Sequence, residues 1–273
     1  MLGIVWGMIT IWKRALATTA IALVAGVGLT ACDSGADKAS DSKGSQSQSE
    51  SQKQAKPSAT MTADDFAQRI NDAQIEAGST HFAQTMEVSG QKIESSGDMV
   101  VDADPRKTRM AMSMPGGMEL RLVDGEMYLN MGELTGGKFY QPSSDAGNPI
   151  TEQLNSSLDQ ANLGKQMSTF KTALKDFTAE EDAETIDGVK TTKYTLVLDS
   201  KKLFEAQELE VPAEAGIGDT IEYVIFAGDD DLPRRMVTDL AGTAITMDFS
   251  KWGEDVSIET PAPDEITDKA PGM

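Results

Sequence analysis

The sequence is poor in the residues on which most catalytic and metal sites depend. Its 273 residues include a single cysteine, Cys32, a single histidine, His81, and only 5% aromatic residues. One cysteine excludes an intrachain disulfide. One histidine leaves no partner imidazole, and we expect His81 to be a surface or half-buried residue at the head of a strand. No serine lies in a G-x-S-x-G elbow or a helix-start S-x-x-K pattern, so we predict no enzyme and no cofactor.

Basic residues are also scarce, with 24 Lys and Arg against 44 Asp and Glu and a formal net charge of −20. A surface this acidic repels nucleic acid, which we therefore exclude as a partner. The acidic runs Glu180–Asp182 and Asp229–Asp231 lack the alternating spacing of a calcium loop, and we interpret them as solvated turn residues. With so many acids, nothing singles out a carboxylate pair for glycoside hydrolysis.

The long hydrophobic stretch of the chain lies at its N-terminus. Lys13 and Arg14 precede an uncharged apolar run that ends in Leu29, Thr30, Ala31 and Cys32. A basic region, a short apolar core and small residues before a cleavage point are typical of a secretory signal peptide, and this run is too short for a membrane span. The last four residues match the bacterial lipobox, so we expect removal of residues 1–31 and a diacylglycerol on the Cys32 thiol. The start of translation, Met1 or Met8, stays open.

The next segment, 32–60, is rich in serine, glutamine and charged residues. After Cys32 its apolar side chains are those of alanine. Such a composition cannot bury enough surface to fold, so we predict a disordered tether with an end-to-end distance of roughly 30 Å. Loss of Lys13 and Arg14 with the signal peptide would take the net charge from −20 to −22. We assign 61–260 to one domain and 261–273 to a C-terminal tail.

The domain opens with a helical pattern and continues as a β meander. Thr62 can cap a helix whose residues Phe66 and Ile70 share a face, and Gly78 can end it. Apolar residues then alternate with polar ones, as in strands. The strands are expected near 82–88, 110–114, 118–122 and 127–131, the last two joined by a hairpin turn at Asp124-Gly125.

The middle of the chain changes its period. One or two amphipathic helices are predicted there from apolar residues spaced by threes and fours: Ile150, Leu154, Leu158, Ala161, Met167, Phe170, Leu174 and Phe177. Strand patterns resume at 190–199, 221–227, 233–240 and 243–249, with a short helix after the first of them. Hairpins dominate, so we predict an α+β fold in which a large curved antiparallel sheet, a half-open barrel, wraps around helices.

Methionines are concentrated in the first meander, where Met110, Met112 and Met114 share one strand face. Three stacked thioethers suit Cu(I), so a Met-rich extracytoplasmic copper site is one hypothesis. Ordinary core packing is a second. The third is a soft wall that repacks around apolar ligands, because Met86, Met118, Met127 and other methionines extend the same surface. The third hypothesis accounts for more of the methionines.

Several segments of the chain together resemble a known family. The lipobox and tether, and the segments Gly97–Met114, Leu120–Met131, Ile186–Asp199 and Asp230–Met236, are together similar to actinobacterial lipoproteins of the LppX/LprG kind. Those proteins share the half-barrel fold of the LolA and LolB carriers. The likeness runs from Thr62 to Glu259 and depends on the order and spacing of short pieces.

The resemblance implies a hydrophobic cavity that binds lipid or glycolipid acyl chains and carries or presents them in the cell envelope. We further expect attachment to the extracytoplasmic face of the cell membrane through Cys32, a monomer, and an envelope transporter as a candidate partner. The alternatives are the copper protein and a structural or interaction lipoprotein without ligand. Candidate wall residues are Phe82, Met86, Met110, Met112, Met114, Leu120, Leu122, Met127, Leu129, Tyr194, Leu196, Ile245, Met247 and Phe249.

Overall fold

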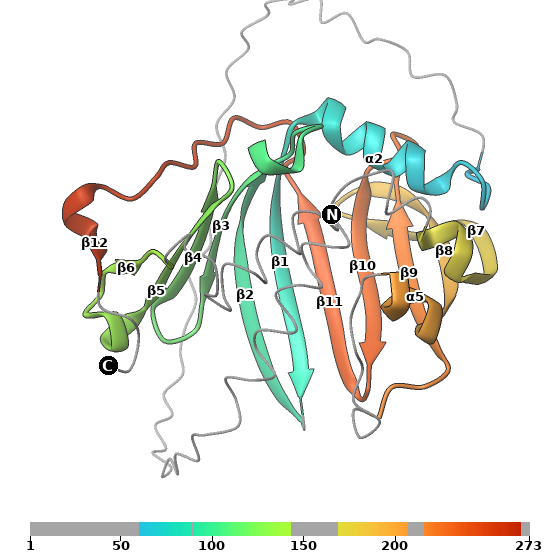
Figure 1. The fold of residues 1–273 in the computed structure, drawn as a ribbon. Coiled ribbons are helices and arrows are strands. Elements are labelled where there is room, and N and C mark those ends of the chain that lie inside the picture. Colours follow the sequence, from blue (N-terminus) through green and yellow to red (C-terminus); the bar gives the residue numbers. More distant parts are fainter. Residues whose placement is uncertain (1–59, 89, 143–168, 207–215, 269–273) are drawn as a thin grey trace, which may run out of the picture.

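A computed structural model describes residues 60–88, 90–142, 169–206 and 216–268. These residues form one twelve-stranded sheet in the order β12-β6-β5-β4-β3-β2-β1-β11-β10-β9-β8-β7. The two end strands do not pair with each other, so the sheet is open, and it curves from one end to the other (Figure 1). The expected α+β half-barrel is confirmed.

The first meander contains β1 (Ser79–Val88), β2 (Gln91–Val100), β3 (Arg109–Met114), β4 (Met118–Val123), β5 (Glu126–Met131) and β6 (Phe139–Tyr140). The second contains β7 (Leu174–Ile186), β8 (Val189–Asp199), β9 (Thr220–Ala227), β10 (Pro233–Leu240) and β11 (Thr243–Ser250), and β12 (Ile266–Thr267) follows. Helices are α2 (Phe66–Ala77) and α5 (Ser200–Ala206), with short 3₁₀ turns η2 (Pro105–Lys107), η3 (Gly132–Thr135) and η5 (Pro263–Glu265).

Two-residue turns set the register of three hairpins. Asp124-Gly125, Asp187-Gly188 and Ala241-Gly242 all have positive φ at both positions. Two successive left-handed residues match the twist of paired strands, and a glycine at the second position adopts this conformation without strain. The predicted antiparallel arrangement holds for every strand pair except β12 with β6, which is parallel. The sheet is therefore mixed at one edge.

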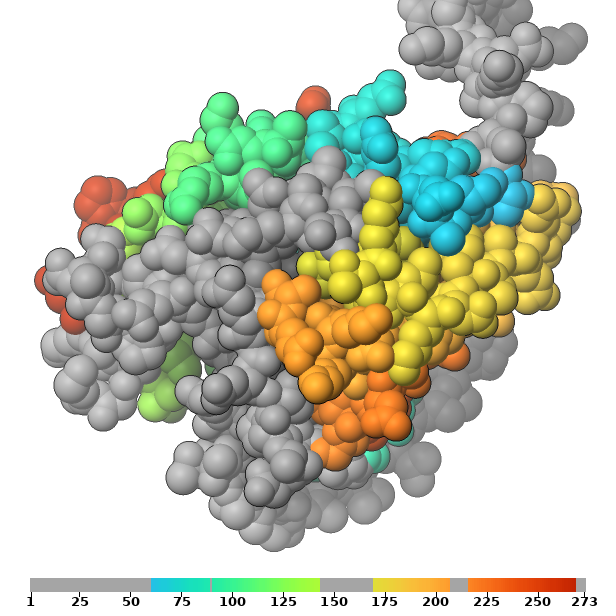
Figure 2. Space-filling view, turned by 45° about the vertical axis from the view of Figure 1, so that its right-hand side comes forward, coloured from blue at the N-terminus to red at the C-terminus, as the bar shows by residue number. Residues whose placement is uncertain are grey.

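We call inner the face of the sheet on which α2 and α5 pack. Side chains from both helices join those of nine strands in one buried cluster, which includes Phe66, Phe82, Met110, Leu196 and Phe204. Phe66 of α2 lies with its ring centroid 5.4 Å from that of Phe177 and 5.1 Å from that of Tyr194. The surface of α2 accordingly adjoins that of β7 and β8 (Figure 2).

The opposite, outer face carries a second and smaller cluster. Val123, Tyr128 and Phe139 from β4, β5 and β6 bury Ile258 of the segment that follows β11. This segment, 251–267, crosses the outer face and ends in β12 (Figure 1). The sheet therefore continues into 261–273, which the sequence analysis assigns to a tail.

The prediction of a helix through Leu174 and Phe177 is wrong, because both lie in β7. Residues 169–173 are helical, and β7 begins directly after them. A register shift between Leu174 and Asp176 inserts a residue, so that Leu174 pairs with Leu198 and Phe177 with Leu196 on the inner face. The bulge places Leu174 and Phe177, three residues apart, on the same face of a strand, and we interpreted this spacing as helical. The remaining predicted helix residues, from Ile150 to Met167, lie outside the described residues.

Two smaller expectations also need correction. Thr62 does not cap α2 with its hydroxyl; instead the Asp65 carboxylate accepts hydrogen bonds from Thr62 N at 2.6 Å and Thr62 Oγ1 at 2.9 Å. Gly78 does end the helix, with φ of 77° and its N–H bonded to the Gln74 carbonyl. The run Glu180–Asp182 is exposed as expected, but it lies in β7 at a second register shift and not in a turn between strands.

Candidate functional site

The methionines of the first meander lie in rows that cross the inner face. Met110 pairs with Met99 of β2 and with Leu122 of β4, which in turn pairs with Met127 of β5. All four side chains are buried. A parallel row contains Met114, Met118 and Met131, which are partly buried. Unbranched thioethers therefore form much of this part of the inner face.

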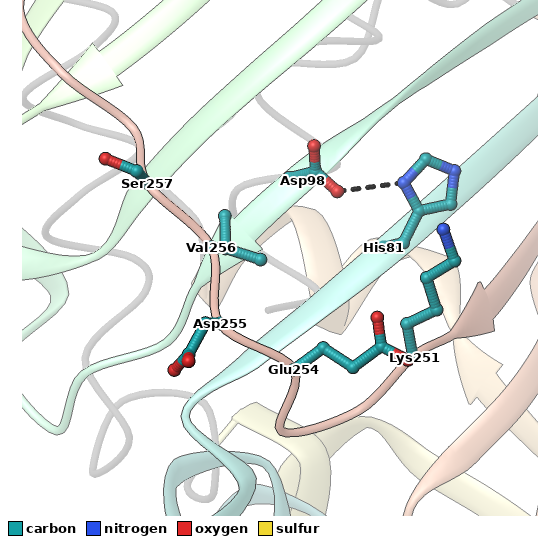
Figure 3. Close-up of a pocket in the computed structure, with 7 residues that line it drawn as sticks. All are labelled: His81, Asp98, Lys251, Glu254, Asp255, Val256 and Ser257. Atoms are coloured by element: carbon teal, nitrogen blue, oxygen red, sulfur yellow. Dashed lines mark hydrogen bonds and ion pairs between the residues drawn. The ribbon is translucent and has the colours of Figure 1, made fainter.

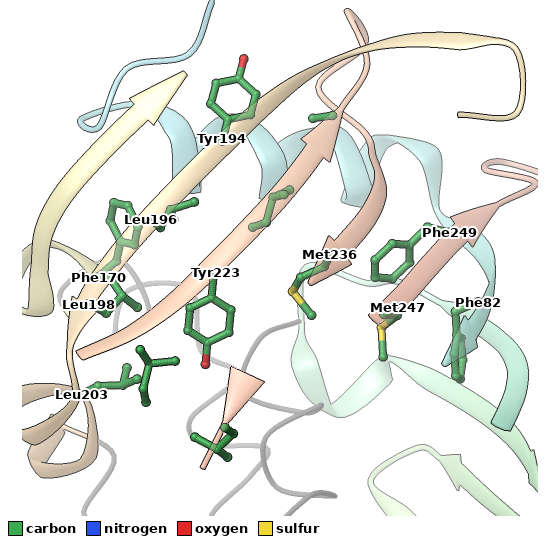
Figure 4. Packing of buried hydrophobic residues seen from close by; sticks show 14 of the residues in the cluster. Phe82, Phe170, Tyr194, Leu196, Leu198, Leu203, Tyr223, Met236, Met247 and Phe249 are labelled. Atoms are coloured by element: carbon green, nitrogen blue, oxygen red, sulfur yellow. The ribbon is translucent and has the colours of Figure 1, made fainter. Parts of the chain in front are cut away.

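The second meander supplies a more aromatic and branched part of the same face. Tyr194, Leu196, Met247 and Phe249, all predicted wall residues, are buried in the main cluster. Figure 4 places them beside Tyr223 and Met236, which the sequence analysis did not select. Both missed residues occupy alternate positions in β9 and β10, so the same period-two pattern could have found them. Ile245 is 1% exposed in β11, and Met86 and Leu129 are partly buried.

The copper hypothesis requires three sulfurs that converge on one accessible point. Met110 and Met112 are instead 3% and 6% exposed, and each occupies a different cross-strand row. Met112 pairs with Gly97 and Leu120, whereas Met114 pairs with Met118. Met110 and Met112 are therefore buried in an apolar wall and Met114 is partly buried, so the row does not present all three sulfurs to solvent.

Most buried polar side chains of the inner face have partners. Thr80 Oγ1 donates to the Ser250 carbonyl at 3.0 Å, and Thr238 Oγ1 donates to the Glu222 carbonyl at 2.8 Å. The Tyr194 hydroxyl accepts a hydrogen bond from Met61 N at 3.2 Å. Burial raises the pKa of Tyr194 above its usual value of 10.0, although the Met61 hydrogen bond acts in the opposite direction.

Gln84 is a further polar residue on the inner face. Gln84 is 8% exposed. In β1 it lies two positions from Phe82 and therefore on the same, inner face, whereas His81 and Ala83 lie on the outer face. The cross-strand neighbours of Gln84 are Met247 and Ser95. Among the described residues the one buried side-chain nitrogen or oxygen without a hydrogen-bond partner is Asn71 Nδ2, so the Gln84 amide is not a buried unpaired group.

Gly97 interrupts the inner face two residues along β2 from Ser95. It pairs with Phe82 on one side and Met112 on the other, and it contributes no side chain between them. A Cβ at this position would lie 2.0 Å from the Ala111 carbonyl oxygen and 2.9 Å from Met112 Cα. Glycine therefore permits a close approach of β2 and β3.

His81 lines a pocket of about 240 Å³ on the outer face, together with Asp98, Lys251, Glu254 and residues 255–257 (Figure 3). Its Nδ1 lies 2.9 Å from Asp98 Oδ1, and its side chain is 34% exposed, as expected for a half-buried residue. Ser257 points away from the imidazole in Figure 3. Its hydroxyl donates to Glu259 Oε1 at 3.3 Å, so no lining hydroxyl is held by His81 as a nucleophile would be.

The described part of the chain shows neither a metal-binding cluster nor a membrane-spanning helix. No group of three or more His, Cys, Asp or Glu side chains there is arranged to hold a metal ion. None of the helices described is long and apolar enough to cross a membrane. Cys32, the lipobox residues Leu29, Thr30 and Ala31, and the tether lie outside the described residues, so the predicted anchor stays a prediction.

No family model matches the chain, and no curated protein matches it in sequence. Among solved structures it is similar to the lipoprotein LppX of Mycobacterium tuberculosis, with 16% identity and a TM-score of 0.49 over 72% of this chain and 98% of that chain. LprF from Mycobacterium bovis matches with 17% identity and a TM-score of 0.47 over 73% and 97%.

MucB in the Pseudomonas aeruginosa MucA/MucB complex matches with 14% identity and a TM-score of 0.39 over 74% of this chain and 59% of that chain. At these identities the likeness concerns the fold alone. The chain is thus similar in fold to lipoproteins of the LppX/LprG kind, the family that its sequence resembles.

Proposed function

We propose that the chain is a membrane-anchored lipoprotein that binds the acyl chains of a lipid or glycolipid against the inner face of its sheet. It would carry or present them at the extracytoplasmic face of the cell membrane, without catalysis. The observation that carries this proposal is the composition of the inner face, where rows of apolar side chains rich in methionine cross an open sheet.

Methionine is the reason to prefer a ligand over a filled core. A core that needs only to be filled is specified more sharply by branched side chains, whereas unbranched thioethers adapt to ligands of varied shape. Each methylene transferred from water to such a wall contributes about 0.8 kcal/mol. A chain of ordinary acyl length can therefore bind tightly to a surface that offers no specific polar contact.

The proposed anchor would hold the domain near its ligand source. A diacylglycerol on Cys32 inserts into the membrane, and the segment 33–59 separates it from Thr60, where the described fold begins. Metabolic labelling with palmitate tests this part: the native chain is expected to incorporate the label and Cys32→Ser to lose it. Equal labelling of both chains would contradict the anchor.

Native mass spectrometry of the chain purified from its own host tests the binding function. We expect a bound mass that matches a lipid. A copper adduct would favour the metal hypothesis, and a bare protein with no lipid under any condition would favour an interaction lipoprotein.

Two neighbouring residues of β3 give a matched pair of variants for this experiment. Met114 is partly buried on the inner face, whereas Ser113 is exposed on the outer face. Met114→Lys would place a charge where the acyl chain is proposed to lie and is expected to weaken lipid binding about tenfold or more. Ser113→Lys adds the same charge on the other face and is expected to leave binding unchanged. Equal effects of the two substitutions would show that the inner face is not the binding surface.

A further inference from the structure

The outer-face pocket is a hollow between the sheet and the segment 251–267. His81 of β1 and Asp98 of β2 line it from the sheet, and the first residues of the segment line it from the other side (Figure 3). The segment is held at both ends of the hollow. Before it, Gly253 N donates to a β1 carbonyl oxygen at 3.0 Å, and after it, Ile258 is buried in the outer cluster. The hollow of about 240 Å³ is therefore built between two fastened points of the chain.

Lys251 reaches this pocket from an unfavourable backbone position. Its φ is 53°, in the left-handed region that costs energy for a residue without a short polar side chain. Figure 3 shows its side chain directed toward the His81 ring, and both residues line the pocket. Among the described residues Lys251 Nζ forms no ion pair, although three carboxylates line the same pocket. Its ammonium group is thus available to a ligand.

The pocket offers hydrogen-bond acceptors and donors together. His81 Nδ1 lies 2.9 Å from Asp98 Oδ1, so with the proton on Nδ1 the neutral imidazole presents Nε2 as an acceptor. The Glu254 carboxylate is a second acceptor. The donors are the Lys251 ammonium group and the backbone N–H groups of 255–257, which have no backbone partner among the described residues. The pocket therefore suits a ligand that both donates and accepts hydrogen bonds.

The lining also argues against several classes of ligand. Val256 is the one apolar side chain among the described lining residues, so a hydrocarbon gains little by burial here. Three carboxylates repel an anion, and the Lys251 ammonium group repels a cation. Pockets for drug-sized molecules occupy roughly 300–1,000 Å³, and this one is smaller at about 240 Å³. A small neutral molecule with several hydroxyl groups meets these conditions, because each hydroxyl both donates and accepts.

We infer that the outer-face pocket binds one neutral sugar ring through its hydroxyl groups. Sugar hydroxyls would donate to His81 Nε2 and to the Glu254 carboxylate, and they would accept from Lys251 Nζ. Asp98 would act as a positioning residue, because its carboxylate holds the His81 ring. The inference goes beyond the proposed function, since the acyl chains are assigned to the opposite face of the sheet.

Five sugars with the same six-membered ring test the site and its charge preference. Glucose, galactose and mannose are neutral, glucosamine adds an amine and glucuronate adds a carboxylate. Binding of each to the full-length chain is measured by titration with saturation-transfer difference NMR. We expect at least one of the three neutral sugars to bind.

Two variants are then measured with the neutral sugar that binds. Lys251→Met keeps the side-chain length and removes the ammonium group, and His81→Phe keeps a ring and removes the acceptor. Each is expected to weaken binding about three- to tenfold, the value of one hydrogen bond. Lys107→Met removes an exposed lysine outside the pocket and is expected to leave binding unchanged. Lys251 is itself exposed, so its variant keeps the test valid if His81→Phe perturbs folding.

Three results would overturn the inference. They are binding of none of the neutral sugars, binding of glucosamine or glucuronate alone, and equal affinity of the native and Lys251→Met chains for a neutral sugar. A lipid found by native mass spectrometry in a chain that binds no sugar would leave the proposed function intact, because the two sites lie on opposite faces.

Discussion

Arg69 of α2 holds Asp231 of the β9–β10 turn with two hydrogen bonds, Nε to Oδ2 at 2.9 Å and Nη2 to Oδ1 at 2.7 Å. The two residues are 162 positions apart, and both side chains are less than one quarter exposed. The pair fastens α2, whose Phe66 ring packs against Tyr194 of β8, to the end of the sheet. It therefore fixes one border of the inner face.

Arg69→Lys tests the importance of this geometry. Lysine keeps the positive charge but cannot form two parallel hydrogen bonds with one carboxylate. We expect the free energy of unfolding to fall by about 1 kcal/mol, measured by urea denaturation. Lys201→Arg on α5, whose exposed ion pair with Glu205 is 3.7 Å long, serves as the control and should change nothing measurable. An unchanged midpoint for Arg69→Lys would mean that charge alone holds α2.

Gly97→Ala is expected to destabilise the sheet by about 2–3 kcal/mol, because its Cβ would collide with the backbone of β3. Gly218→Ala is a suitable comparison, since a Cβ there meets its nearest atom, the Thr220 carbonyl oxygen, at 3.7 Å. That variant should stay within about 0.5 kcal/mol of the native chain. Thermal unfolding followed by circular dichroism measures both, and equal stability of the two variants would refute the close approach of β2 and β3.

Tyr194→Phe removes the hydroxyl that accepts from Met61 N and keeps the ring against Phe66 and Phe177. Near neutral pH we expect a loss of about 1 kcal/mol. The folded-state pKa of Tyr194 is raised by burial, so its contribution is complete below pH 10.0 and is lost as pH rises through the folded pKa. Phenylalanine does not titrate, so the advantage of the native chain should shrink above pH 10.0, as urea titrations at several pH values would measure. A constant difference would contradict the burial of an ionisable hydroxyl.

Asp65→Asn makes the opposite prediction at acid pH. Burial raises the pKa of Asp65, but hydrogen bonds from Thr62 and the charge of Arg69 outweigh it and leave the pKa below 3.8. The carboxylate therefore contributes stability above pH 3.8 that is lost as pH falls through its folded-state pKa. We expect Asp65→Asn to cost at most about 1 kcal/mol at pH 7, because the side chain is partly exposed. The free energies of unfolding of the two chains should converge at low pH. A difference that persisted there would show that the effect comes from the shape of the side chain and not from its charge.

The sequence allowed the β meanders to be predicted because strict alternation and the Asp124-Gly125 turn act locally. The face of Met110 and Met112 followed from this alternation, and so did the wall residues of β8 and β11. The pattern failed at Leu174 and Phe177, where a bulge replaced the period of two with a spacing that a helix also produces. Whether such a spacing belongs to a helix or to a bulged strand depends on pairing with β8, and a local sequence pattern carries no information about that pairing.

The outer cluster was missed for a different reason. Ile258 lies in a segment without periodicity, and its burial depends on Val123, Tyr128 and Phe139, which are more than a hundred residues away in sequence.

An open sheet has two unpaired edges, and each could template pairing with another molecule. In β7 the edge is broken by the register shift between Glu180 and Glu184, and exposed acids project there. At the opposite end β12 contributes just two residues. Neighbouring copies would therefore meet either at β7, which is interrupted and acidic, or at β12, which is short. If the chain is anchored in a membrane as proposed, these edges disfavour sheet-to-sheet pairing between neighbouring copies.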